Sequence, residues 1–189
     1  QSVPRGTWHL SGAVMDWYFG RADQPPYEPP QQVGRKSAPA RKGMGRVIAI
    51  ASQKGGVGKT TTAINLGACL AQESRRVLLI DIDPQGNATS GLGVNGNDQR
   101  TTVYEALIGQ AEMRQAVVPT ALANLDLLPA GQRLSGAEVE LVGMMARETR
   151  LKQCLVPVRQ EYDFILIDGP PSLGLLTVNA LTAADSVLI

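Results

Sequence analysis

The chain of 189 residues has little of what several classes of protein need. Its two cysteines, Cys69 and Cys154, lie far apart and outside any Cys-x-x-Cys or Cys/His cluster, so neither a disulfide framework nor a zinc site is predicted. No apolar run approaches the ~20 residues of a membrane span, and the N-terminus lacks the apolar segment of a signal peptide. We therefore expect a reduced, cytoplasmic protein without a membrane partner.

An excess of charge of one sign is also absent. Eighteen Lys and Arg residues stand against seventeen Asp and Glu, a net charge of +1, so the composition does not point to nucleic acid or to a membrane surface. Aromatic residues make up only 4% of the chain, yet 43% of the residues are hydrophobic, which is enough for one well-buried domain. Any charged partner must therefore be met locally.

The composition changes sharply near residue 44. Residues 1–43 hold five of the eight aromatic residues, the only histidine, and a proline cluster followed by four basic residues with no acidic residue among them. No apolar periodicity supports a packed element there, so we expect a disordered, Pro-rich and basic extension. A basic arm that contacts DNA or an acidic partner is one interpretation. We favour a solvated tail, or translated sequence upstream of a start at Met44.

Residues 44–189 alternate short apolar runs with longer segments of helical pattern. The apolar runs are continuous, which is typical of parallel strands covered on both faces, so we predict a doubly wound, mostly parallel α/β sheet with three α/β/α layers. The expected strands are 47–51, 77–80, 125–128, 164–167 and 187–189, and the expected helices are 61–72, 102–108, 136–147, 148–160 and 175–183. Because the sequence stops within the last predicted strand and no turn signal follows it, we expect the domain to be incomplete at its C-terminus.

The first predicted strand runs into a glycine-rich loop, and a helix follows directly. The glycines let backbone amides point inward and the helix N-terminus adds its positive dipole, so the main chain can hold a di- or triphosphate. Lys59 supplies charge to the β and γ phosphates, and Thr60 places its hydroxyl on Mg²⁺. The usual pattern has glycine where this chain has Gln53, and Lys54 is an additional lysine. The expected nucleotide-binding residues are Lys54, Gly55, Gly56, Val57, Gly58, Lys59, Thr60 and Thr61.

A glycine turn without a ligand is the alternative, which the strand–loop–helix context disfavours.

Two later strands end in acidic loops. Asp83 follows the second strand and could orient or deprotonate an attacking water, whereas the alternative makes Asp81 and Asp83 turn or helix-capping residues; taken alone, the pattern favours neither. Asp168 follows a later strand in the Walker B arrangement, where a carboxylate holds Mg²⁺ directly or through water. The expected metal ligands are Thr60, Asp83 and Asp168, and the expected catalytic residues are Lys54, Lys59 and Asp83.

Together these loops resemble those of the ParA/Soj family of chromosome and plasmid partitioning ATPases, in the deviant Walker A group of P-loop ATPases. The similar stretches are the glycine loop 54–60, the switch I stretch 83–89 and the switch II stretch 168–174. Stretch 136–141 is similar to a helical stretch of the same family. The resemblance covers about Met44 to Ile189. Neither cysteine follows an acidic or glycine loop, which separates the chain from the relatives that carry an iron–sulfur cluster.

The resemblance implies an ATPase that acts as a slow molecular switch in DNA partitioning, with ATP and Mg²⁺ as cofactors. It implies a homodimer closed by ATP, in which Lys54 of one subunit reaches the phosphates bound by the other. In the family, this dimer binds double-stranded DNA without sequence preference, which implies association with the bacterial nucleoid, and a ParB-type centromere-binding protein stimulates hydrolysis. Two alternatives stay open: a MinD-like ATPase that positions the division site at a membrane surface, and a fragment that binds no nucleotide.

Overall fold

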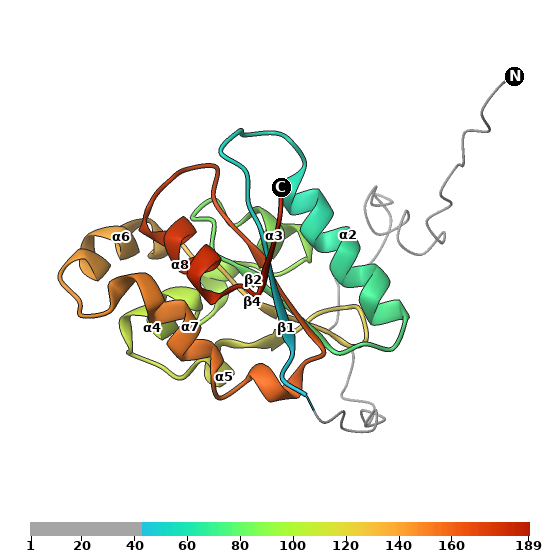
Figure 1. Cartoon of the computed structure of the whole chain (residues 1–189). Coiled ribbons are helices and arrows are strands. Elements are labelled where there is room, and N and C mark those ends of the chain that lie inside the picture. Colours follow the sequence, from blue (N-terminus) through green and yellow to red (C-terminus); the bar gives the residue numbers. More distant parts are fainter. Residues whose placement is uncertain (1–42) are drawn as a thin grey trace, which may run out of the picture. The chain divides into compact units, whose positions relative to one another are not determined.

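The computed structural model describes residues 43–189, so the extension expected over residues 1–43 lies outside the described residues except for Gly43. The predicted α/β sheet is confirmed: the described chain forms a six-stranded sheet in the order β3-β4-β2-β5-β1-β6 (Figure 1). All neighbouring strands are parallel except β3 and β4. The strands are β1 (Arg46–Ile50), β2 (Val77–Asp81), β3 (Val118–Pro119), β4 (Leu125–Leu128), β5 (Phe164–Asp168) and β6 (Ser186–Leu188).

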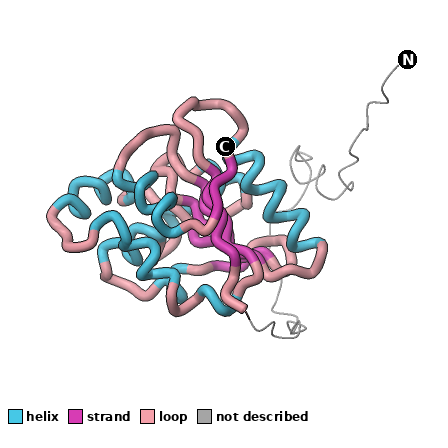
Figure 2. The backbone as a smooth tube through the Cα atoms, in the orientation of Figure 1, coloured by secondary structure: helices cyan, strands magenta, loops and turns pink. Residues whose placement is uncertain are grey.

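Helices cover both faces of this sheet, as a doubly wound fold requires (Figure 2). One face packs against α2 (Lys59–Gln72) and α3 (Asn87–Gly91). The other face packs against α4 (Val103–Ile108), α5 (Met113–Ala116), α6 (Leu134–Val142), α7 (Arg150–Leu155) and α8 (Leu175–Ala183). Within residues 43–189, no helix has the length and apolar character needed to cross a membrane.

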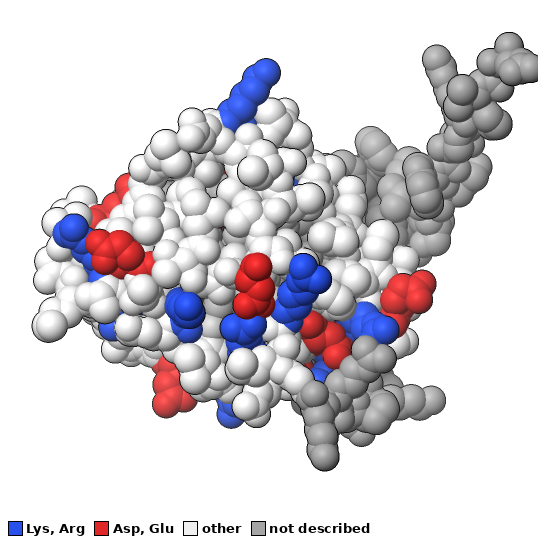
Figure 3. Space-filling model, viewed as in Figure 1, with Lys and Arg blue, Asp and Glu red and all other residues white. Residues whose placement is uncertain are grey.

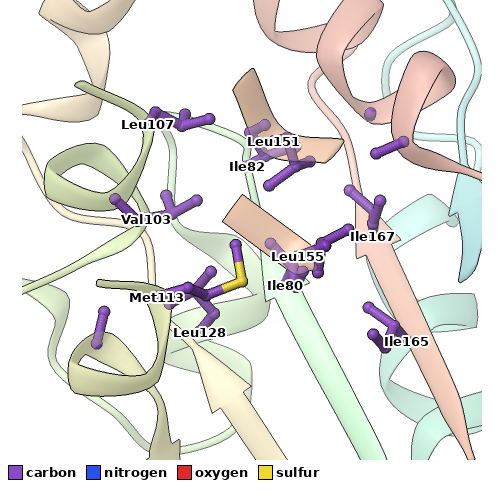
Figure 4. Packing of buried hydrophobic residues seen from close by; sticks show 14 of the residues in the cluster. Ile80, Ile82, Val103, Leu107, Met113, Leu128, Leu151, Leu155, Ile165 and Ile167 are labelled. Carbon is purple, nitrogen blue, oxygen red and sulfur yellow. The ribbon is translucent and has the colours of Figure 1, made fainter. Parts of the chain in front are cut away.

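Successive residues of each strand serve opposite faces, because strand side chains alternate. In β2, Leu78 and Ile80 belong to the cluster under α4–α8, whereas Leu79 belongs to the cluster under α2, and all three are fully buried. Figure 4 shows part of the first cluster, to which Ile80 of β2 and Leu155 of α7 both belong. Burial on both faces explains why the apolar runs of the sequence are continuous rather than alternating.

Two of the predicted helices, 136–147 and 148–160, are wrong in their bounds. The first of them begins earlier and ends at Val142, and Ala146 beyond it has a left-handed backbone with a φ of 55°, which cannot continue a helix. The second is interrupted before Pro157, which lacks the amide hydrogen that a helix interior needs. Its ends are two short 3₁₀ turns, Arg147–Thr149 and Arg159–Glu161.

Four short elements have no counterpart among the predictions: α3, the 3₁₀ turn Gly96–Asp98, α5 and β3. Helices of four or five residues contain too few turns to display an apolar period, and β3 has only two residues. Pro119 in β3 cannot donate a hydrogen bond to a sheet, which fits its position in the edge strand.

Candidate functional site

The carboxyl ends of β1, β2 and β5 lie side by side, so the three loops singled out in the sequence reach the same edge of the sheet. Asp168 at the end of β5 is in register with Ile50 of β1 and with Asp81 of β2. Residues in register on neighbouring strands point to the same face, so the carboxyl groups of Asp81 and Asp168 face the layer that contains α2 and α3. This edge of a parallel sheet is where ligands bind in doubly wound folds.

The glycine loop joins β1 to α2, and two of its glycines have positive φ values, 71° at Gly56 and 91° at Gly58. No atom lies within 4 Å of the place where a Cβ would stand at either residue, so the backbone conformation, rather than lack of space, favours glycine. Gly58 is also the N-cap residue of α2 and makes no side-chain capping bond. The first-turn amides of α2 have no intrahelical partner, and they therefore suit an anionic group held by the loop.

The two loop lysines are placed differently. The Nζ of Lys59 donates a 3.3 Å hydrogen bond to the carbonyl oxygen of Lys54, so the side chain of Lys59 folds back over the loop. Lys59 is half-buried, whereas Lys54 is exposed. An anion held by the loop amides would therefore meet the Lys59 ammonium of the same chain, while the exposed Lys54 side chain can reach a second molecule.

The carboxylate of Asp168 is fully buried, yet neither of its oxygens has a hydrogen-bond partner of ordinary geometry in the described part of the chain, although the Thr60 hydroxyl is close enough to act on it. Burial raises its pKa to about 6; the nearby Thr60 hydroxyl and Lys59 ammonium lower the pKa, and the Asp83 carboxylate raises it. An unpartnered buried carboxylate is costly, and a cation would satisfy it. One carboxylate and one hydroxyl, completed by phosphate oxygens and water, are the ligands with which Mg²⁺ is commonly held.

The structure supports the turn interpretation of Asp83, and its part in catalysis stays a prediction. It is 6% exposed, and its Oδ1 accepts a 2.9 Å hydrogen bond from the amide of Gln85, which is turn chemistry. Its charge nevertheless raises the pKa of Asp168, so the two carboxyl groups are close enough to interact. The turn therefore fixes the orientation of the Asp83 carboxyl group in the neighbourhood of Asp168.

Asp81 has a role that the sequence analysis did not assign to it separately. It is fully buried and accepts three hydrogen bonds, from the amide of Thr89 at 2.7 Å, from its hydroxyl at 2.7 Å and from the amide of Asp83 at 3.1 Å. Burial raises the pKa of Asp81 to about 7, although the hydrogen bonds from Thr89 lower it. Helix α3 begins after Gly86, which has no side chain to cap it. The capping interpretation therefore applies to Asp81.

Within residues 43–189, no group of three or more His, Cys, Asp or Glu side chains is arranged to hold a metal ion. The three predicted metal ligands include only two side chains of these types, Asp83 and Asp168, beside the hydroxyl of Thr60. This arrangement fits Mg²⁺, which takes few protein ligands and keeps oxygens from phosphate and water. Whether Asp83 contacts the metal stays a prediction.

Comparison with known proteins gives the family. Residues 45–189 match the family described as AAA domain. The chain is 60% identical over 146 residues to the sporulation initiation inhibitor protein Soj of Bacillus subtilis (strain 168), covering 77% of this chain and 58% of Soj. It is 58% identical over 146 residues to the chromosome partitioning protein ParA of Myxococcus xanthus (strain DK1622), covering 77% of this chain and 52% of that protein. The chain thus spans a little over half the length of these curated relatives.

A solved structure is similar over the same part of the chain. The cobyrinic acid a,c-diamide synthase from Mycobacterium smegmatis, with bound ATP analog and magnesium, has a TM-score of 0.74 and 47% sequence identity, covering 76% of this chain and 58% of that one. The resemblance deduced from the three loops is confirmed by these matches. The chain belongs to the AAA domain family and, within it, to the ParA/Soj family of P-loop ATPases.

Proposed function

We propose that the protein is an ATP-dependent molecular switch of DNA partitioning that binds Mg-ATP and hydrolyses it slowly. The observation that carries this proposal is the buried, unpartnered carboxylate of Asp168 beside a glycine loop whose helix N-terminus is uncapped. The two features complement the two parts of Mg-ATP, since one takes a cation and the other takes phosphate. The names of the Soj and ParA relatives support the role in partitioning.

Each part of the nucleotide site has a distinct task in this proposal. The amides of residues 55–61 hold the phosphates, and Lys59 neutralises charge on the β and γ phosphates. Asp168 and Thr60 would hold Mg²⁺, which when bound lowers the negative charge of the phosphates. Asp83, oriented by its bond from Gln85, orients or deprotonates the attacking water.

The second part of the proposal concerns assembly. We infer a homodimer closed by ATP, in which the exposed Lys54 of one subunit reaches the phosphates held by the other. A charge delivered by a second subunit makes hydrolysis depend on the dimeric state, which is the behaviour expected of a timer. A ParB-type centromere-binding partner would stimulate hydrolysis and so release the dimer from DNA.

DNA binding in this proposal is non-specific and acts on the phosphate backbone, and it would associate the protein with the nucleoid. Figure 3 shows acidic and basic side chains interspersed on one face of the molecule, so this face offers no broad basic surface. The affinity for DNA should depend on contacts of Lys and Arg side chains with the phosphate backbone and fall as the salt concentration rises.

The test is retention of double-stranded DNA by the Asp83→Ala variant in ATP and in ADP, at a fixed low salt concentration. Retention in ATP alone, lost as salt rises, supports the switch. Binding of ATP without DNA retention in either nucleotide contradicts the role in partitioning. In that case, binding of the same variant to anionic lipid vesicles tests the division-site alternative.

A further inference from the structure

Stretch 136–141 lies in α6 and takes no part in the nucleotide site described so far. The Oε1 atom of Glu138 in this stretch accepts a 3.3 Å hydrogen bond from the amide of Leu176, in the first turn of α8. The N-cap residue of α8 is Gly174, which makes no side-chain capping bond. Glu138 therefore supplies from another helix the oxygen that an N-cap side chain ordinarily supplies, and its charge suits a helix N-terminus.

Glu138 and Gly174 fit against each other. A Cβ at position 174 would clash with the carboxylate of Glu138. The backbone of Gly174 has φ −97° and ψ −177°, an extended conformation that any residue adopts. A side chain at position 174 would therefore require the flexible Glu138 side chain to move away from the start of α8.

The helix turn that Glu138 caps follows directly after the switch II stretch. That stretch begins at Asp168 and ends at Gly174, the N-cap residue of α8. The hydroxyl of Thr177 in the same turn donates a 2.6 Å hydrogen bond to the carbonyl oxygen of Ser172, so the loop is tied to the start of α8. The position of this turn thus determines where the loop that follows Asp168 ends.

The loop that precedes α6 also contacts the switch I stretch. The amide of Ala130, in the loop that precedes α6, donates a 2.9 Å hydrogen bond to the Oγ1 of Thr89, and this hydroxyl donates to Asp81. On the outer side, the hydroxyl of Tyr104 donates a 2.7 Å hydrogen bond to Glu140, which holds α6 on α4. Helix α6 and the loop before it therefore connect the two acidic loops of the site.

The three helices that start at this edge all begin with a glycine N-cap, namely Gly58, Gly86 and Gly174. Two of these N-termini are served by carboxylates from other elements, α3 by Asp81 and α8 by Glu138. The N-terminus of α2 is the one that takes the nucleotide phosphates in the proposed function. Glu138 thus serves the N-terminus of α8 as Asp81 serves that of α3.

We propose that Glu138 is a positioning residue for ATP hydrolysis: it caps α8 from α6 and thereby holds the switch II loop in the arrangement in which Asp168 meets Mg²⁺. The proposal rests on the proposed ATPase function. Without the cap, the start of α8 loosens, and Asp168 is held less well. The Mg²⁺ requirement should then rise and turnover should fall, while the glycine loop still binds nucleotide.

The experiment compares the purified protein with Glu138→Ala, Glu138→Gln and the double variant Glu138→Ala/Gly174→Ser. Glutamine keeps an acceptor oxygen. In the double variant, the truncated residue 138 makes room for a serine whose own hydroxyl can cap α8, since the backbone at position 174 is already extended. Val139→Ala, at an exposed position on the same helix, is the matched control.

The readouts are the rate of ATP hydrolysis at saturating nucleotide, the Mg²⁺ concentration for half-maximal rate, and the midpoint of thermal unfolding. For Glu138→Ala we expect turnover to fall about fivefold and the Mg²⁺ requirement to rise about fivefold, the size of one lost cap. In the double variant and in Glu138→Gln, the hydrolysis rate and the Mg²⁺ requirement should both lie within about twofold of the parent values. Val139→Ala should match the parent protein.

The inference is overturned if Glu138→Ala keeps both the parent rate and the parent Mg²⁺ requirement. It is also overturned if the double variant regains the parent unfolding midpoint but stays as impaired as Glu138→Ala, because the cap would then serve stability alone. A parent protein that hydrolyses no ATP would instead contradict the proposed function. The Mg²⁺ dependence of nucleotide binding, measured on the same variants, then decides the role of Glu138.

Discussion

Asp81 and Asp168 lie in register on neighbouring strands, both fully buried, but Asp81 accepts three hydrogen bonds and Asp168 accepts none within the described residues. Two carboxylates at the same edge of a sheet thus differ in their hydrogen-bond partners. The first is committed to the protein, where it fixes the start of α3. The second has lone pairs that would accept a cation in the proposed function.

Replacing Asp83 by alanine should leave ATP binding within about twofold of the parent protein while turnover falls by roughly 10² to 10⁴, because the group that orients or deprotonates water is lost. Phosphate release and equilibrium ATP binding are measured on the same preparation. Asp98→Ala, which removes an exposed carboxylate, is the control. A parent-like rate in Asp83→Ala would show that Asp83 is only a turn residue.

Replacing the exposed Lys54 by alanine should spare nucleotide binding by the monomer and prevent the dimer that forms with ATP. The physical reason is that Lys54 is proposed to act on the phosphates of the other subunit. Light scattering after size-exclusion chromatography in ATP measures the dimer, and Lys152→Ala on the exposed side of α7 is the control. An undiminished ATP dimer in Lys54→Ala argues against the role across the interface.

Replacing Thr89 by valine should destabilise the protein by about 1–3 kcal/mol, because the hydroxyl between Asp81 and the Ala130 amide is removed and both groups stay buried. Thr89→Ser keeps the hydroxyl, and its free energy of unfolding should fall by less than that of Thr89→Val. Urea denaturation gives the free energy of unfolding of each variant. Equal stability of the valine and serine variants would mean that the hydroxyl contributes nothing.

The carboxyl of Asp185 predicts an acid-sensitive contribution to stability. Partial burial raises its pKa, but hydrogen bonds from the Val47 amide and from Arg159 outweigh this effect, so the pKa is lowered from 3.8. A folded pKa below the unfolded one contributes stability that is complete above pH 3.8 and is lost as the pH falls through the lowered pKa. Asp185→Asn should therefore flatten the acid side of a plot of unfolding free energy against pH. An unchanged acid side would show that Asp185 does not contribute.

The sequence predicts the sheet and the glycine loop because both are local patterns: continuous apolar runs, and glycines between a strand and a helix. The sequence does not separate the role of Asp81 from that of Asp83. The role of Asp81 depends on its hydrogen bonds with Thr89, eight residues further along the chain. The contact between Glu138 and Leu176 spans 38 residues and joins two helices. Hydrogen bonds of this kind depend on how the elements pack, which a periodic pattern does not contain.

The most direct test of the account is calorimetric titration of ATP with and without Mg²⁺ into the parent protein, Asp168→Asn and Lys59→Ala. The account predicts that Mg²⁺ tightens ATP binding to the parent protein and no longer does so in Asp168→Asn, which lacks the buried charge for the cation. Lys59→Ala should bind ATP at least roughly tenfold more weakly in both conditions, since a charge-assisted contact is lost. If Mg²⁺ tightens ATP binding to Asp168→Asn as much as to the parent protein, Asp168 does not hold the Mg²⁺ of Mg-ATP.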